Sequence, residues 1–315
     1  MQLPPALLQA VDVALEGAQR GELAAAQENL SRRYRGEVRD GRAHIGDDLT
    51  ARAYLAARLP ATYAALRAAL DAVSERRPEF APRSLLDFGA GPGTALWAAR
   101  DCWPDLHAAL LIETSAAIRT FGAGFAAESG VVHIDWKPAL DTSTPHDLVT
   151  IAYVLDELDP DRRAPLLEHL WSLTGDVFLI VEPGTPAGWR RILDARALLL
   201  NAGAHLVAPC AHETACPLAA PDWCHFSRRV ARSRVHLAAK DAEVPWEDEK
   251  FIYLAVSRHT GALPSARVIA PSRIGSGKVE LKLCSADGDA KMELVTRRQG
   301  DRFKAARRTT WGETL

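Results

Sequence analysis

Three glycines follow a short apolar segment in the run Leu85-Leu86-Asp87-Phe88-Gly89-Ala90-Gly91-Pro92-Gly93-Thr94. Glycine lets a backbone turn tightly and approach a ligand where a Cβ atom would clash. Glu113 comes 22 residues after Gly91, at the expected end of the next strand, where its carboxylate can accept hydrogen bonds from both hydroxyls of a ribose. The spacing predicts a site for a nucleoside-bearing cofactor. A dinucleotide is disfavoured, because the pattern G-x-G-x-x-G needs glycine where this chain has Thr94.

These residues resemble the cofactor motif of class I S-adenosylmethionine-dependent methyltransferases. The first loop of that motif has an acid and three glycines, which match Asp87, Gly89, Gly91 and Gly93, and Glu113 matches the acid that closes its second strand. In that class an acid at the end of the third strand contacts the adenine, and the resemblance gives this role to Asp135. The resemblance implies S-adenosylmethionine as cofactor. The alternative is that the glycines only shape a turn between a strand and a helix.

The segment that follows the fourth expected strand holds the candidates for chemistry. In class I enzymes this strand end faces the transferred methyl group, and much of the rate comes from orienting the nucleophile. The segment has neither the Asn/Asp-Pro-Pro-Tyr/Phe pattern of amino-group methylation nor the Pro-Cys pair of cytosine-C5 enzymes. Tyr153, Asp156 and Glu157 are the candidates, and each is equally consistent with a structural role. No catalytic residue is assigned.

Four of the five cysteines have a spacing that could bind a metal. Cys210, Cys216 and Cys224 form the pattern C-x5-C-x7-C, and Cys284 follows after 59 further residues. Zinc sites usually contain a C-x2–4-C knuckle, which is absent, whereas iron–sulfur ligands tolerate wider gaps. A mixed zinc site stays open because His205, His212 and His225 lie nearby, so spacing alone leaves cluster, zinc and unbound thiols as alternatives. Cys102, alone on an expected helix, is interpreted as a small buried hydrophobic residue.

The elements that must position these residues follow from hydrophobic periodicity. Residues 5–80 predict helices, with a break at Pro60. Expected strands at 84–88, 108–113, 131–135, 147–153, 177–182 and 251–257 then alternate with expected helices at 95–102, 115–128, 162–173 and 189–201. This alternation predicts an α/β fold with a Rossmann-like parallel sheet. We expect three regions: a helical segment 1–80, a methyltransferase-like domain 81–260 with a Cys-rich insertion 203–250, and a small basic β tail 261–315.

Composition excludes several classes of protein. The 315 residues are 48% hydrophobic and 25% charged, which excludes disorder and collagen-like repeats. No apolar run reaches the roughly 20 residues that span a bilayer. The N-terminus lacks a basic region before its apolar stretch, so we expect no signal or transit peptide, a cytoplasmic location and no membrane partner. Residues 225–315 hold 18 Lys and Arg against 11 Asp and Glu, which favours a polyanionic partner or a solvated charged surface.

Longer runs of the sequence resemble one particular family. They are similar to methyltransferase-like proteins of mitochondrial small-ribosomal-subunit assembly and to their bacterial relatives. The Cys-rich block is the specific part, because the glycine loop fits any methyltransferase. Nearly the whole chain is covered, in these runs: Leu30-Ser31, Tyr34-Arg35, Pro60-Ala61-Thr62-Tyr63, 86–94, Glu182-Pro183-Gly184, 209–212, Cys216-Pro217, 223–226 with Arg228 and Arg229, 247–251, Ala306-Arg307 and Trp311-Gly312.

The resemblance implies a small-subunit maturation factor that binds ribosomal RNA and carries a [4Fe–4S] cluster on Cys210, Cys216, Cys224 and Cys284. An RNA partner fits the basic residues on both sides of the thiols, and we expect contacts from Arg228, Arg229, Arg232, Arg297, Arg298, Arg307 and Arg308. The cluster would then join the β tail to the insertion. Methyl transfer stays open in this family. The alternatives are a non-catalytic rRNA-binding assembly factor and a small-molecule methyltransferase with structural zinc.

Overall fold

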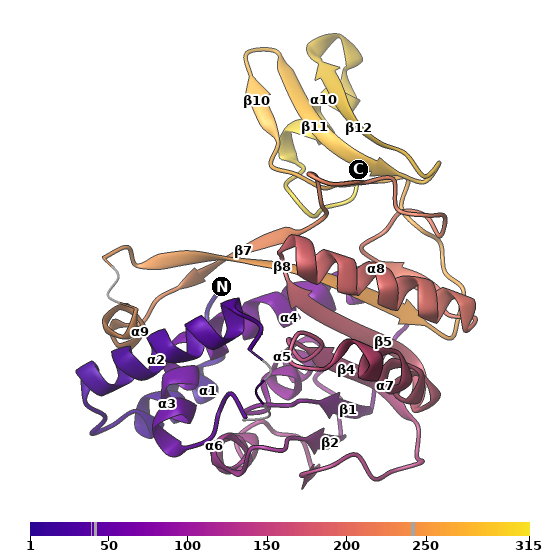
Figure 1. Cartoon of the computed structure of the whole chain (residues 1–315). Coiled ribbons are helices and arrows are strands. Elements are labelled where there is room, and N and C mark those ends of the chain that lie inside the picture. Colours follow the sequence, from indigo (N-terminus) through magenta and orange to yellow (C-terminus); the bar gives the residue numbers. More distant parts are fainter. Residues whose placement is uncertain (39, 41–42, 241–242) are drawn as a thin grey trace.

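The computed structural model describes residues 1–38, 40, 43–240 and 243–315 (Figure 1). Four helices open the chain: α1 (Pro5–Ala14), α2 (Arg20–Arg35), α3 (Asp48–Ala57) and α4 (Leu59–Arg76). Pro60 does separate two helices, as expected. It lies in the first turn of α4, where the N–H group that proline lacks has no partner within the helix. Within the described residues, no helix combines the length and the apolar composition required to cross a bilayer.

A large mixed sheet follows these helices. Five strands are parallel: β1 (Ser84–Phe88), β2 (Ala108–Ile112), β3 (His133–Lys137), β4 (His146–Ala152) and β5 (Thr174–Pro183). The long strand β8 (Trp246–Ser257) lies antiparallel to β5, and β6 (His205–Ala208) pairs with its other side. The order β3-β2-β1-β4-β5-β8-β6 is the class I methyltransferase arrangement that the glycine motif predicts.

Helices cover both faces of this sheet. The chain moves outward from β1 through α5 (Thr94–Cys102) and α6 (Ala116–Ala126), then returns to the centre and moves the opposite way through α7 (Pro160–Ser172) and α8 (Pro186–Asn201). Since parallel crossovers are right-handed, this reversal places the two helix pairs on opposite faces. It also makes the carboxyl ends of β1 and β4 the switch point, where open α/β sheets bind ligands. The strands there are fully buried, as in Leu85, Leu86, Val149 and Ile151.

The Cys-rich insertion expected at 203–250 is not separate from the sheet. It forms β6 and β7 (Phe226–Ala231), which lie one after the other along the same edge of β8. α9 (Arg234–Ala239) follows β7, and the last five residues of the segment begin β8. Both β6 and β7 were missed. β7 presents mainly charged pairs to its partner, such as Arg228 opposite Glu249 and Arg229 opposite Asp248, so the apolar alternation that signals a strand is confined to Phe226 and Val230.

The C-terminal residues form a second, smaller sheet, which Figure 1 shows in yellow above the main body. It contains β9 (Ala266–Val268), β10 (Arg273–Gly275), β11 (Lys278–Ser285) and β12 (Ala290–Thr296), followed by a short 3₁₀ turn η1 (Arg297–Gln299) and α10 (Asp301–Arg308). The turn expected at Asp287-Gly288 does join β11 to β12. The sheet has its own apolar cluster, in which Val279, Leu281 and Val295 pack with Phe303. Residues 266–308 are called the C-terminal module below.

Candidate functional site

A large cavity lies at the switch point of the main sheet. Its volume is about 800 Å³, and its lining includes Gly89 and Gly91 after β1, Glu113 after β2 and Tyr153 after β4. Residues of α2, α3 and α4 line the other side, so the N-terminal helices close the cavity over the strand ends. The cavity therefore combines the motif residues with side chains that are distant in the sequence.

The glycine loop needs glycine for two different reasons. Gly89 has φ +75°, and a Cβ atom there would lie 2.3 Å from Cγ2 of Val154, which follows β4. Gly91 has φ +54°, and a Cβ atom there would make only an ordinary contact, 3.8 Å from the hydroxyl oxygen of Tyr54, so only its backbone conformation is demanding. The loop thus passes directly over the end of β4, and the two strands that flank the switch point are in contact there.

Glu113 is held across this loop. One carboxylate oxygen accepts a hydrogen bond from the backbone N–H of Gly91 at 2.9 Å, and the other accepts from the N–H of Ser115 at 2.7 Å. A carboxylate oxygen has two lone pairs, so each can still accept a hydroxyl proton. The carboxylate is fixed at the cavity wall and retains capacity for a ribose.

Three other residues of the expected cofactor set do not line the cavity. Asp87 is buried beneath the loop, where it accepts a hydrogen bond from the hydroxyl of Thr150 at 2.7 Å, and burial raises its pKa to about 7. A Cβ atom on Gly93 would face the ring of Trp136. Asp135 is exposed in the middle of β3, because that strand continues to Lys137 in register with Ile112 rather than ending at the acid. The structure therefore does not bring Asp135 to the cavity.

The segment after β4 contributes all three of its candidates. Tyr153, Asp156 and Glu157 line the cavity. Tyr153 has φ +57°, a conformation that a bulky residue rarely adopts, and its hydroxyl donates to Oε1 of Glu249 at 3.0 Å. Asp156 is buried, which raises its pKa, whereas Glu157 is exposed to the cavity.

Arg58 and Glu249 also line the cavity, and the sequence analysis gave neither of them a role in the site. Arg58, at the start of α4, lies with its guanidinium 5.5 Å from the centre of the Tyr153 ring and 3.4 Å from Oε1 of Glu249. Glu249 is on β8, 191 residues from Arg58. No local pattern could reveal this contact, because it forms only when β8 adds to the sheet beside β5.

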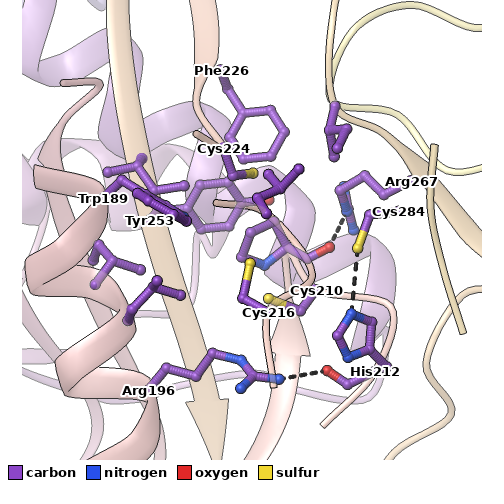
Figure 2. A pocket seen from close by; sticks show the side chains of 16 residues that line it. Trp189, Arg196, Cys210, His212, Cys216, Cys224, Phe226, Tyr253, Arg267 and Cys284 are labelled. Carbon is purple, nitrogen blue, oxygen red and sulfur yellow. Dashed lines mark hydrogen bonds between the residues drawn. The ribbon is translucent and has the colours of Figure 1, made fainter. Parts of the chain in front are cut away.

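A second cavity, of about 40 Å³, is lined by the four clustered cysteines (Figure 2). Cys210, Cys216 and Cys224 lie on the loop between β6 and β7, and Cys284 is on β11. β6 ends opposite Ala255 and β7 begins opposite Phe251, so the loop starts and ends about 13 Å apart along β8. This fixed span folds three thiols back toward the sheet, and β11 brings the fourth. Cys102 lies apart from them at the end of α5.

The thiols are close enough to affect one another electrostatically. Burial, then the neighbouring thiols, raise the pKa of Cys224 well above its ordinary range, and the positive charge of Arg267 opposes this rise. Burial likewise raises the pKa of Cys284 to about 11. Sγ of Cys284 lies 3.5 Å from Nε2 of His212. Among the described residues, no three His, Cys, Asp or Glu side chains are gathered as ligands of a single metal ion.

The donor chemistry of this cavity nevertheless suits a thiolate-bound group larger than one ion. Three sulfurs come from the loop between β6 and β7 and the fourth from β11, and the rest of the wall is mainly apolar, with Trp189, Phe226 and Tyr253 among its residues. Such walls exclude water from a metal site and its ligands. His205 was one of the histidines that kept zinc open, and it is half-exposed near Glu213. Only His212, among the three histidines considered, lines the cavity.

The arginines expected to contact RNA differ in their surroundings. Arg229 forms a two-pronged ion pair with Asp248 and stacks on Trp246, and Arg232 pairs with Glu247 at 2.9 Å. Arg228 is exposed on β7. In the C-terminal module the exposed arginines of the expected set are Arg297, Arg298, Arg307 and Arg308. None of the four takes part in an ion pair among the interactions that the structure describes.

Known proteins provide an independent comparison. A family model described as mitochondrial small ribosomal subunit Rsm22 matches residues 48–315. The human ribosome assembly protein METTL17, mitochondrial, is 30% identical over 287 residues, which cover 83% of this chain and 61% of that protein. The Rsm22-cox11 tandem protein 2, mitochondrial, of Schizosaccharomyces pombe is 21% identical over 319 residues, covering 83% of this chain and 42% of that protein. The chain thus spans about two fifths to three fifths of these relatives' lengths.

Solved structures share less sequence with the chain. The magnesium protoporphyrin IX methyltransferase of Synechocystis PCC 6803, solved with bound SAH, is 13% identical and aligns over 76% of this chain and 97% of its own, with a TM-score of 0.42. An O-methyltransferase family protein from Burkholderia thailandensis is 14% identical over 78% of this chain and 73% of its own, with a TM-score of 0.45. The family model is the comparison that covers most of the sequence. The chain belongs to the family described as mitochondrial small ribosomal subunit Rsm22.

Proposed function

We propose that this protein is an S-adenosylmethionine-binding, methyltransferase-like factor that acts in assembly of the small ribosomal subunit. The observation that carries the proposal is the position of Glu113 across the glycine loop, at the wall of the switch-point cavity. Family membership and the name of the human relative, a ribosome assembly protein, supply the ribosomal context. When bound, the cofactor supplies an electrophilic methyl group on a sulfonium.

The chain's own residues would hold the cofactor in a defined way. Glu113 accepts the ribose hydroxyls, and Gly89 and Gly91 leave room for the rest of the molecule to pass close to the backbone. Tyr153 and Glu157, at the end of β4, would face the methyl group and orient an acceptor. If the protein is an enzyme, an acceptor is methylated in this cavity. If it is a non-catalytic factor, the cavity only maintains the fold that binds RNA.

Calorimetric titration with S-adenosylmethionine tests the cofactor site. Glu113→Ala removes two charge-assisted hydrogen bonds to the ribose, so the dissociation constant should rise about tenfold or more. Asp135→Asn is the matched control, because this acid is exposed and outside the cavity. The affinity of this variant for S-adenosylmethionine should equal that of the unmodified chain. Equal weakening by both variants would contradict the assignment of Glu113.

We also propose that Cys210, Cys216, Cys224 and Cys284 bind a [4Fe–4S] cluster. The convergence on one cavity of three thiols from the loop between β6 and β7 and a fourth from β11 supports this. Anaerobic purification with iron, sulfide and zinc measured per chain is the test. About four irons with absorption near 400 nm support the cluster. One zinc and no iron supports the alternative, a structural zinc site.

For RNA, we propose that the C-terminal module makes the main contacts. Arg297, Arg298, Arg307 and Arg308 are exposed, whereas Arg229 and Arg232 already have carboxylate partners. Replacing the four module arginines with alanine should weaken binding to a small-subunit rRNA transcript and reduce the salt slope by about three. Arg229→Ala with Arg232→Ala should change the slope by less than one. A larger loss from the second pair would move the interface to β7.

The two functional alternatives give different results in the same assays. A non-catalytic assembly factor keeps its RNA affinity in Glu113→Ala and transfers no methyl group to ribosomal RNA. A small-molecule methyltransferase with structural zinc carries one zinc per chain, shows no iron absorption and has no salt-dependent RNA binding. The cytoplasmic location expected from the N-terminal residues stays a prediction, since the two relatives compared above are named as mitochondrial proteins.

A further inference from the structure

The wall of the thiol cavity contains two buried guanidinium groups. Arg196 is on α8 and Arg267 is on β9, and only 6% and 3% of their surfaces are exposed. Figure 2 shows them on opposite sides of the four sulfurs, with Arg196 on the helix side and Arg267 beside Cys284. Arginine stays protonated under all ordinary conditions, so the cavity wall carries two permanent positive charges.

Among the described residues, neither guanidinium has a carboxylate within ion-pair distance. Nη2 of Arg196 donates to the carbonyl oxygens of His212 and Thr214 at 2.8 and 2.7 Å. Arg267 donates to the carbonyl oxygens of Pro209 and Gly312. These acceptors are neutral, and none of the ion pairs that the structure describes includes either arginine. Their hydrogen bonds orient the side chains but leave both charges uncompensated.

Other buried arginines of the same chain show the contrast. Arg191 pairs with Glu182 at 2.5 Å, and Arg77 pairs with Asp176 at 3.3 Å. All four arginines are less than one tenth exposed. A buried charge is normally retained in a fold only when an opposite charge lies nearby. Among the residues that line this cavity, only the four cysteines and Tyr253 can become negative, and a thiol loses its proton more readily than a phenol, so the counter-charge belongs on the sulfurs.

We propose that Arg196 and Arg267 are the counter-ions of the group bound by the four cysteines, and that they determine how firmly it is held and how easily it is reduced. The inference rests on the cluster proposed above. Four thiolates and a [4Fe–4S] core of charge +2 sum to −2, which two guanidiniums balance. Reduction by one electron makes the group more negative, and the two positive charges favour that state.

Charge-neutral variants test this proposal. Arg196→Gln and Arg267→Gln keep a side-chain amide donor for the carbonyl oxygens and remove the charge. Each should lose iron to a chelator about tenfold or more faster than the unmodified chain, as outer-shell changes at metal sites typically do. Each should also have a lower reduction potential in a titration followed by electron paramagnetic resonance. Arg267→Lys, which keeps the charge, should restore both properties at least in part.

Arg77→Gln is the matched control, because it removes a buried arginine whose charge is compensated away from the thiols. It should lower stability and leave the reduction potential unchanged. If both glutamine variants have the reduction potential and the rate of iron loss of the unmodified chain, the inference is overturned and the proposed cluster is not affected. If the chain carries zinc, the proposal of a [4Fe–4S] cluster is overturned. Faster zinc loss from the same variants would still support the role of the two arginines as counter-ions. A chain that binds neither metal overturns both proposals.

Discussion

The sulfur of Cys284 lies 3.5 Å from Nε2 of His212, although 72 residues separate them in the chain. Nδ1 of the same imidazole lies 2.8 Å from the hydroxyl oxygen of Thr214. A hydroxyl that donates to Nδ1 leaves Nε2 protonated and able to donate to the sulfur. This chain of contacts joins β11 of the C-terminal module to the loop between β6 and β7, so the module is attached to the body at the thiol cavity.

The turn between β11 and β12 offers a way to loosen this attachment. Gly288 has φ +84°, and a Cβ atom there would lie 2.6 Å from the hydroxyl oxygen of Thr214. Gly288→Ala should therefore strain the turn and push the module away from the loop, which increases proteolytic cleavage at residues 258–265. Gly300→Ala is the control, since Gly300 has φ +58° with open space around it. Similar cleavage rates in both variants would show that the contact with Thr214 does not hold the module.

At the switch point, the contact between Gly89 and Val154 predicts a coupled pair. Gly89→Ala places a residue at φ +75°, which costs about 1–2 kcal/mol, and adds a collision with Val154. Val154→Ala removes the collision and leaves the backbone cost. The double variant should therefore be more stable than the sum of the two single changes, by about 1 kcal/mol or more, in urea unfolding. If the effects of the two single changes on the free energy of unfolding simply add, the glycine loop moves to avoid the collision with Val154.

Asp87 predicts a pH-dependent stability. Its pKa in the folded chain is about 7, against an ordinary value of 3.8, because the carboxyl is buried. The folded state therefore binds the proton more tightly than the unfolded state. The carboxyl contributes most to the free energy of unfolding below about pH 4, and this contribution is lost as the pH rises to about 7. The upper limit of the loss is about 4 kcal/mol.

Asp87→Asn keeps the oxygen that accepts from Thr150 and removes the titration. The variant should unfold at a higher temperature than the unmodified chain near pH 8, and the difference should shrink toward pH 4. Thermal unfolding of both chains across this range is the measurement. A difference that is constant with pH would show that Asp87 titrates in the folded chain as it does in the unfolded one.

Arg77 predicts a large effect of one buried ion pair. Its guanidinium lies 3.3 Å from Asp176 and donates to the hydroxyl of Ser257 at 2.6 Å, which links the end of α4 to β5 and β8. Arg77→Leu should lower the free energy of unfolding by about 3 kcal/mol. Arg229→Ala, whose ion pair with Asp248 is exposed to solvent, should change the free energy of unfolding much less. Equal losses of unfolding free energy in the two variants would show that the buried ion pair of Arg77 with Asp176 does not stabilise the fold more than a surface pair does.

Much of the fold follows from local patterns in the sequence. The apolar segment at 84–88, its glycine loop and the helix from Thr94 have the expected bounds within one residue, because an apolar run, three glycines and a helical period are all local signals. The main errors occur where a strand carries charged residues or continues because of its partner strand. β7 carries arginines that pair with acids on β8, and β3 continues past Asp135 because its partner β2 continues beside it.

The sequence by itself determined which residue types were available for binding: a glycine loop with Glu113, four cysteines and a basic C-terminal region. Only the tertiary structure decided which of them meet. The sheet order brings Arg58 to Glu249, leaves Asp135 in solvent and places Arg196 and Arg267 around the thiols. The physical reason is that such contacts join segments far apart in the chain, and their geometry depends on strand order and register rather than on neighbouring residues.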